Sequence, residues 1–172
     1  HQDRFYGQEV DPDDVMVSTG ASEAIGAAIM ALVSEGQEVV VFEPYFDLYA
    51  AVIALAGGVR RAVTLRAPDY SFDEAQLAAA IGPETRLILL NTPHNPTGKV
   101  FSPEELGVIA RLAVQHDLLV VTDEVYEHMT YDGTQHVPIA TLPGMAERTV
   151  TISSGGKSFG LTGWKVGWAH GP

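Results

Sequence analysis

Short apolar segments rich in β-branched residues alternate with longer segments of helical periodicity along this sequence. Such alternation is typical of repeated βα units, which place parallel strands in one sheet and cover it with helices. We therefore expect an α/β fold with a mostly parallel sheet sandwiched by helices. Strands are predicted at residues 15–18, 38–42, 60–65, 86–90, 118–122, 149–153 and 166–169, and helices at 22–33, 46–56, 73–81 and 102–116.

Helix boundaries are marked by side chains that satisfy free backbone groups. Ser102, followed by Pro103 and Glu105, fits the S-x-x-E capping box, and Ser71 with Glu74 has the same spacing. Both serines are predicted to cap a helix. Glycines at 57–58 and at 82 predict the ends of the helices that precede them.

The composition narrows the classes of partner. With 172 residues, 46% of them hydrophobic, the chain can bury a core as one domain. Its net charge of −12 argues against nucleic acid as a partner, because phosphate neutralisation needs an excess of Lys and Arg. The apolar segments are too short to span a bilayer, so no membrane partner is expected. The absence of cysteine and the spacing of the six histidines predict no metal site, and a reducing cytoplasmic location is expected.

Polar and aromatic residues with functional potential follow the predicted strands at their carboxyl ends. Open α/β sheets build their ligand-binding crevice at that edge. The sequence therefore predicts one site that collects residues from several strand ends. These residues are Gly20, Ala21 and Ser22 after the first strand, Phe46 after the second, Asn95 after the fourth, Asp123 after the fifth, and Ser154 and Lys157 after the sixth.

Lys157 lies in a Gly-Gly-Lys-Ser string that resembles part of a phosphate-binding P-loop. That motif needs glycine six residues before the lysine, where this chain has Thr151, and no G-x-G-x-x-G occurs. The P-loop and the Rossmann fingerprint are therefore excluded. A surface lysine is the simplest interpretation of Lys157, whereas a lysine buried on a glycine-rich turn at a strand end is a nucleophile toward carbonyls.

Each of the other residues also has an ordinary structural interpretation. Asp123 could cap a helix or be a buried carboxylate that needs a cationic partner. Tyr126 and Phe46 could pack in the core, and the asparagines of the loop 91–98 could satisfy its backbone. The residues 20–22 could start a helix without binding an anion. Their shared location at one sheet edge favours a binding site.

Four motifs in this order carry a family resemblance: Asn95-Pro96-Thr97-Gly98, Asp123-Glu124-Val125-Tyr126, Ser154-Gly155-Gly156-Lys157 and Gly163-Trp164-Lys165-Val166-Gly167. Together they resemble the fold-type I pyridoxal-phosphate aminotransferases of class I/II over essentially the whole chain. The resemblance is closest to the branch of kynurenine, glutamine and methionine aminotransferases and N-succinyldiaminopimelate aminotransferase.

The resemblance implies pyridoxal 5′-phosphate as cofactor and gives the site residues their roles. Lys157 would form the Schiff base with the cofactor and then shuttle a proton, while Asp123 would pair with the pyridine nitrogen. The 3-oxygen of the ring would accept hydrogen bonds from Tyr126 and Asn95, and Asn95 would also contact substrate. Phe46 would stack on the ring. The phosphate would be held by Ser154, Lys165 and the amides of Gly20, Ala21 and Ser22.

Position 165 departs from the usual family pattern, which often has arginine there. Lysine would replace a bidentate grip on the phosphate with a point charge, and the branch named above accepts it.

The resemblance also implies an activity and a domain organisation. Residues 1–172 would form the large, cofactor-binding domain, with an N-terminal segment, a small C-terminal domain and its carboxylate-binding arginine outside the chain. The full protein would be a homodimer that transfers an amino group from an amino acid to a 2-oxo acid by a ping-pong route. The 172 residues alone would hold cofactor without turnover.

Two other functions share this fold and cofactor. One is a β-lyase of the cystathionine β-lyase type, and the other is a non-catalytic sensor domain in a transcription regulator. Release of pyruvate and ammonia would identify the first, and an upstream winged-helix segment the second.

Overall fold

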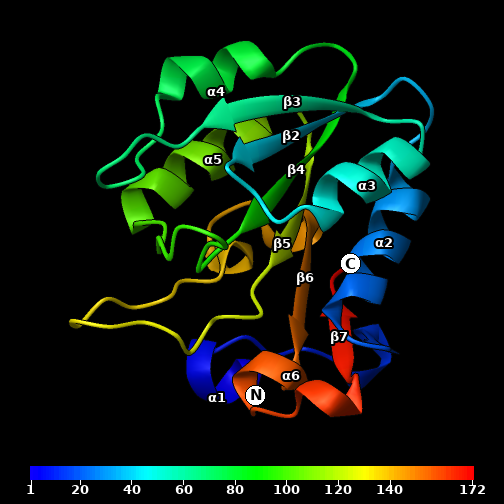
Figure 1. The fold of residues 1–172 in the computed structure, drawn as a ribbon, viewed down its shortest axis with the longest axis vertical. Coiled ribbons are helices and arrows are strands. Elements are labelled where there is room, and N and C mark those ends of the chain that lie inside the picture. The colour runs from blue at the N-terminus through cyan, green and yellow to red at the C-terminus, as the bar shows by residue number, and fades with distance from the viewer.

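The computed structural model describes residues 1–172 and contains one seven-stranded sheet with the strand order β1-β7-β6-β5-β4-β2-β3 (Figure 1). Only β7 runs opposite to the other six strands, so the expected mostly parallel sheet is confirmed. Every predicted strand is present, with its ends shifted by at most one residue. The strands are β1 (Val15–Ser18), β2 (Glu38–Glu43), β3 (Val59–Thr64), β4 (Thr85–Asn91), β5 (Leu119–Asp123), β6 (Thr149–Ser154) and β7 (Gly167–His170).

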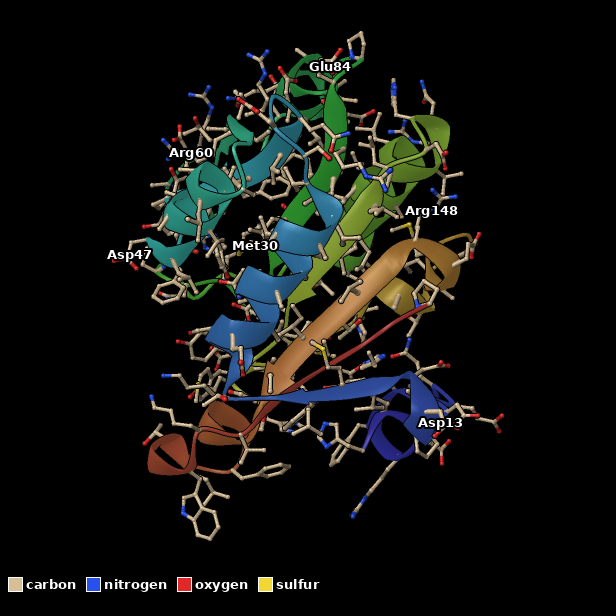
Figure 2. All side chains as sticks on the ribbon, turned by 90° about the vertical axis from the view of Figure 1, so that its right-hand side faces the viewer. Asp13, Met30, Asp47, Arg60, Glu84 and Arg148 are labelled. Carbon is tan, nitrogen blue, oxygen red and sulfur yellow. The ribbon has the colours of Figure 1, made fainter.

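Helices cover both faces of the sheet. One face packs against α2 (Ala21–Leu32) and α3 (Leu48–Leu55), and the other against α4 (Glu74–Ala80) and α5 (Pro103–Gln115). Strand β2 contributes to both cores, because Val39 and Val41 point to the first and Val40 and Phe42 to the second. The outer sides of these helices face solvent, as the half-exposed Met30 of α2 shows (Figure 2). No helix is both long and apolar enough to cross a membrane.

Several short elements were not predicted, since each is too brief for a periodic pattern. They are α1 (Gln2–Tyr6), α6 (Gly155–Ser158) and 3₁₀ turns at Pro12–Asp14, Ile139–Thr141, Ala146–Arg148 and Thr162–Trp164.

One of the two predicted capping boxes is present. The Ser102 hydroxyl accepts from the Glu105 amide at 3.2 Å, and the Glu105 carboxylate accepts from the Ser102 amide at 2.9 Å. The box predicted at Ser71 is wrong. Ser71 pairs with Arg66 in an isolated bridge, so the helix begins only after Asp73, whose carboxylate accepts from the Ala75 amide at 2.8 Å.

Glycine follows both helix ends as predicted, but only one of the two glycines is left-handed. Gly57 follows α3 with a left-handed φ of 76°, which only glycine adopts without cost. Gly82 likewise lies two residues past the end of α4 at Ala80, but it is not left-handed, and its amide donates to the Thr85 hydroxyl at 2.8 Å.

A close approach of β7 to the start of α2 depends on Gly167. A Cβ atom there would lie 2.4 Å from the carbonyl carbon of Gly20 and 2.5 Å from the amide nitrogen of Ala21. Such distances do not occur between unbonded atoms in folded proteins. The absence of a side chain at 167 therefore fixes where α2 begins relative to the sheet.

We predict that Gly167→Ala lowers the free energy of unfolding by about 1–3 kcal/mol, because the methyl group overpacks against backbone that cannot rotate away. Urea unfolding followed by circular dichroism measures the change. Gly107→Ala is the matched control, since Gly107 is exposed on α5 with no atom within 4 Å of the new Cβ. That control is expected to stabilise by about 0.5–1 kcal/mol. Equal stability of Gly167→Ala and the wild type would contradict the steric role.

Candidate active site

A cavity of about 610 Å³ opens at the carboxyl ends of β1, β4, β5 and β6. Its walls come from the start of α2, from α3 and the residues just before it, from the loop after β4, and from α6 with the segment that follows. All ten site residues expected from the sequence line this one cavity, and their individual roles stay predictions. They are Gly20, Ala21, Ser22, Phe46, Asn95, Asp123, Tyr126, Ser154, Lys157 and Lys165.

Strand register brings Asn91 next to Asp123, since the two residues are paired partners on β4 and β5. The Asn91 amide group donates to the Asp123 carbonyl oxygen at 2.8 Å and to that of Pro93 at 3.2 Å. Its side-chain oxygen accepts from the Asn95 amide at 2.7 Å. Asn91 therefore satisfies loop backbone, as one interpretation of this segment expected, and it holds Asn95 at the cavity.

Asp123 is a buried carboxylate with no ion-pair partner. It is 4% exposed, and its Oδ2 accepts from the Tyr49 hydroxyl at 2.7 Å, while Oδ1 accepts from the Val125 amide at 3.3 Å. Burial raises the pKa of this carboxyl to about 6, and the bonds from Tyr49 and Val125 oppose that rise. No helix follows Asp123, so the helix-cap interpretation is wrong. The site presents a buried anion to a cavity that has room for a cationic ligand.

Lys157 lies on the short helix α6 and is exposed, in contrast to the burial considered from its sequence context. Its Nζ lies 5.6 Å from the centroid of the Tyr126 ring. The glycine-rich turn holds the lysine at the mouth of the cavity, where no packed layer of this chain covers it. The amine is therefore accessible to a carbonyl compound that enters the cavity.

Tyr49 is a cavity residue that the sequence analysis missed. It follows Phe46 by three residues, and the two rings meet edge to face with centroids 5.8 Å apart. A spacing of three residues places side chains on one helix face, which was the available signal. Inside an apolar helix this spacing also describes core packing, so the pattern alone could not identify Tyr49.

The start of α2 offers an anion-binding end to the cavity. The first amides of a helix have no intrahelical acceptor, and those of Ala21 and Ser22 lie at this position. The Gly20 amide is not free, because it already donates to the Ser18 carbonyl at 2.9 Å, and its part in anion binding stays a prediction. Lys165 lines the same cavity in a left-handed conformation with a φ of 54°, and Ser154 is a buried lining residue.

These groups fit pyridoxal phosphate by the chemistry of their donors and acceptors. The buried Asp123 suits a protonated ring nitrogen, Phe46 offers an aromatic face, and the accessible Lys157 amine suits an aldehyde. The α2 amides and Lys165 suit a phosphate group.

Glu127 anchors the lysine-bearing turn from the side opposite the cavity. Its Oε1 accepts from the Ser153 hydroxyl at 3.0 Å and from the Ser158 hydroxyl at 3.4 Å, while Oε2 accepts from Tyr6 at 2.8 Å. The His1 ring nitrogen lies 3.1 Å from Oε2. Possible ligand atoms of His1, Glu127 and His128 lie within 4.8 Å of one another, a grouping that sequence spacing could not reveal. Because both oxygens of Glu127 are already engaged, its evident role is to connect α1, β6 and α6.

Comparison with known proteins decides the family. The family model described as aminotransferase class I and II matches residues 2–172. The chain belongs to this family. The expected fold of an aminotransferase large domain is confirmed by superposition on a solved structure of the family.

Named relatives of this aminotransferase-family chain agree with the resemblance seen in its motifs. It is 50% identical over 98% of its length to a probable N-succinyldiaminopimelate aminotransferase of Mycobacterium tuberculosis and 49% identical over 98% to kynurenine–oxoglutarate transaminase 1 of Rattus norvegicus. It covers 43% of each of those proteins, and so spans less than half of their length.

Solved structures of the family superpose closely on this chain. The structure of N-succinyldiaminopimelate aminotransferase from Mycobacterium tuberculosis gives a TM-score of 0.96 at 49% identity, with 99% of this chain and 45% of that one covered. The Escherichia coli protein YbdL, described as having a methionine aminotransferase function, gives 0.96 at 41% identity, with 99% and 46% covered.

We predict that Asp123→Asn stabilises the unliganded protein increasingly as pH rises. The folded-state pKa of about 6 lies above the ordinary 3.8, so protonated Asp123 causes no penalty below pH 4 and ionised Asp123 destabilises the fold above pH 6. The stability difference between variant and wild type should grow between these values by about 3 kcal/mol. Urea unfolding at intervals from pH 4 to pH 8 measures it. A difference independent of pH would show that Asp123 does not titrate in this range.

Proposed function

We propose that the protein carrying this chain transfers an amino group from an amino acid to a 2-oxo acid, with pyridoxal 5′-phosphate bound in the cavity. The observation that carries the proposal is one cavity that joins a buried carboxylate without a cationic partner, Asp123, to the accessible amine of Lys157. Family membership and the names of the relatives support it.

Asp123 and Lys157 divide the proton chemistry between them. When bound, pyridoxal phosphate supplies an electron-withdrawing ring that accepts charge from the α-carbon of the substrate. The Asp123 carboxylate keeps a proton on the ring nitrogen, because a buried anion is stabilised by an adjacent cation. The Lys157 amine would hold the cofactor through its aldehyde, and Nζ, when free, would accept the proton from the α-carbon of the substrate. Two such half-reactions make a ping-pong route.

The remaining cavity residues orient the reacting groups. Tyr126 and Asn95 line the cavity. Their hydroxyl and amide donors would bind the ring 3-oxygen, and Asn95 would also contact substrate. Phe46 would offer its aromatic face to the ring. The amides of Ala21 and Ser22, the Ser154 hydroxyl and the Lys165 ammonium would hold the phosphate.

Substrate choice and assembly depend on more than this chain. Four apolar side chains beside Lys157 are at least two-fifths exposed, which is typical of a surface covered in an assembly. We expect another part of the protein or a second subunit of a homodimer to cover them, and we expect a cytoplasmic location. The four are Phe159, Leu161, Trp164 and Val166.

We predict that borohydride reduction of the protein incubated with pyridoxal phosphate attaches a phosphopyridoxyl group to Lys157, because it is the one of the two cavity lysines whose charge acts on Asp123. Peptide mass spectrometry locates the label. Lys157→Ala should abolish it and reduce amino transfer to 2-oxoglutarate by about 10²-fold or more.

The control for this labelling is Lys99→Ala, which should keep both the label and turnover. A label on Lys99 or Lys165 of the wild type would refute the role given to Lys157. Release of pyruvate and ammonia in place of amino transfer would identify a β-lyase.

A further inference from the structure

Tyr49 makes the shortest hydrogen bond to the one buried carboxylate of the cavity. It is 2% exposed on α3, and its hydroxyl lies 2.7 Å from Asp123 Oδ2, across 74 positions of sequence. The other contact of the carboxylate, from the Val125 amide, is longer at 3.3 Å. The phenol is therefore the strongest donor that the fold itself supplies to Asp123.

The direction of this hydrogen bond follows from the two acidities. Burial and the adjacent Asp123 charge raise the pKa of Tyr49 well above its usual range, while the pKa of Asp123 is about 6. At neutral pH the phenol keeps its proton and donates, and the carboxylate accepts. A charge-assisted bond of this kind favours the ionised form of the acceptor and fixes its orientation.

We infer that Tyr49 is a positioning residue for Asp123, holding its carboxylate ionised and oriented toward the ring nitrogen of the bound cofactor. The inference about the carboxylate rests on the hydrogen bond alone. The part that concerns the cofactor rests on the function proposed above.

The hydrogen bond from Tyr49 affects which group holds a shared proton, the Asp123 carboxylate or the ring nitrogen of the cofactor. In a water-poor site the neutral pair, a carboxylic acid beside an unprotonated nitrogen, competes with the charged pair. A donor to the carboxylate makes it a weaker base, so the proton stays on the nitrogen and the ring remains electron-withdrawing. In the unliganded protein the other charges that act on Asp123 are Lys157, which also favours its ionised form, and Glu124, which opposes it. Tyr126 also lies near the Tyr49 phenol.

The first test needs no cofactor. Carbon-13 NMR of the aspartate carboxyl groups in the unliganded protein should show that Tyr49→Phe raises the pKa of Asp123 by about 1–2 pH units, with Asp123→Asn used to assign the signal. Tyr45→Phe is the matched control: it removes a hydroxyl four residues away that bonds Arg60 and does not touch Asp123. It should leave the Asp123 titration unchanged. An unchanged titration in folded Tyr49→Phe would overturn the inference.

The second test uses pyridoxal phosphate labelled with nitrogen-15 in the ring. In Tyr49→Phe the ring resonance should move from the pyridinium value toward that of neutral pyridine, and in Tyr45→Phe it should stay. In an Asp123→Asn background, Tyr49→Phe should leave the position of this resonance unchanged and should alter cofactor affinity by no more than about 2-fold. The reason is that the effect of Tyr49 passes through the Asp123 carboxylate. Equal effects in both backgrounds would show a merely structural role.

The two tests separate failure of this inference from failure of the proposed function. If the wild type bound no pyridoxal phosphate, the proposed function would be refuted. The titration of the Asp123 carboxyl would still show whether Tyr49 acts on it. If cofactor bound at Lys157 and Tyr49→Phe changed neither titration nor resonance, the role of Tyr49 alone would be refuted.

Discussion

Keeping a carboxylate ionised at the buried end of a strand is the constraint on which the rest of the site depends. Asp123 ends β5 in the middle of the sheet, and its side chain is almost completely buried. Without compensation such a group would take up a proton and lose its use as a partner for a cation. The chain compensates from two elements, with a phenol on α3 and a backbone amide two residues further on. The cavity supplies space for the cation that completes the pairing.

Strand order turns this local chemistry into a site. Because β4, β5 and β6 are adjacent and parallel, their carboxyl ends deliver the Asn91 loop, Asp123 and the lysine turn to one edge. The antiparallel β7 then passes beside the start of α2, and Gly167 permits contact between backbones there. The start of α2, which forms the anion-binding end of the cavity, is thus positioned by β7 through a residue that has no side chain. A substitution at Gly167 would therefore disturb both the fold and the site.

The sequence predicted elements well because their signals are local and repetitive. Apolar β-branched segments identified all seven strands, and strand ends identified the cavity residues, since topology forces such ends together. Features that depend on partners distant in sequence were missed or mistaken. Ser71 was misjudged because its bridge to Arg66 delays the helix. The Gly20 amide was counted as free although Ser18 accepts it, and Tyr49 was missed because its partner lies 74 residues away. The residues adjacent to Lys157 in the sequence could not show that its side chain is exposed.

The Glu127 anchor makes the first turn of the chain and the lysine turn parts of one mechanical unit. Tyr6 of α1 shares the Glu127 carboxylate with Ser153 and Ser158, which lie on either side of the residues 154–157. A displacement of α1 would therefore change the hydrogen bonds that brace Lys157 from behind. Through this carboxylate, the stability of α1 affects how rigidly the turn that carries Lys157 is held, and hence how well its amine is oriented.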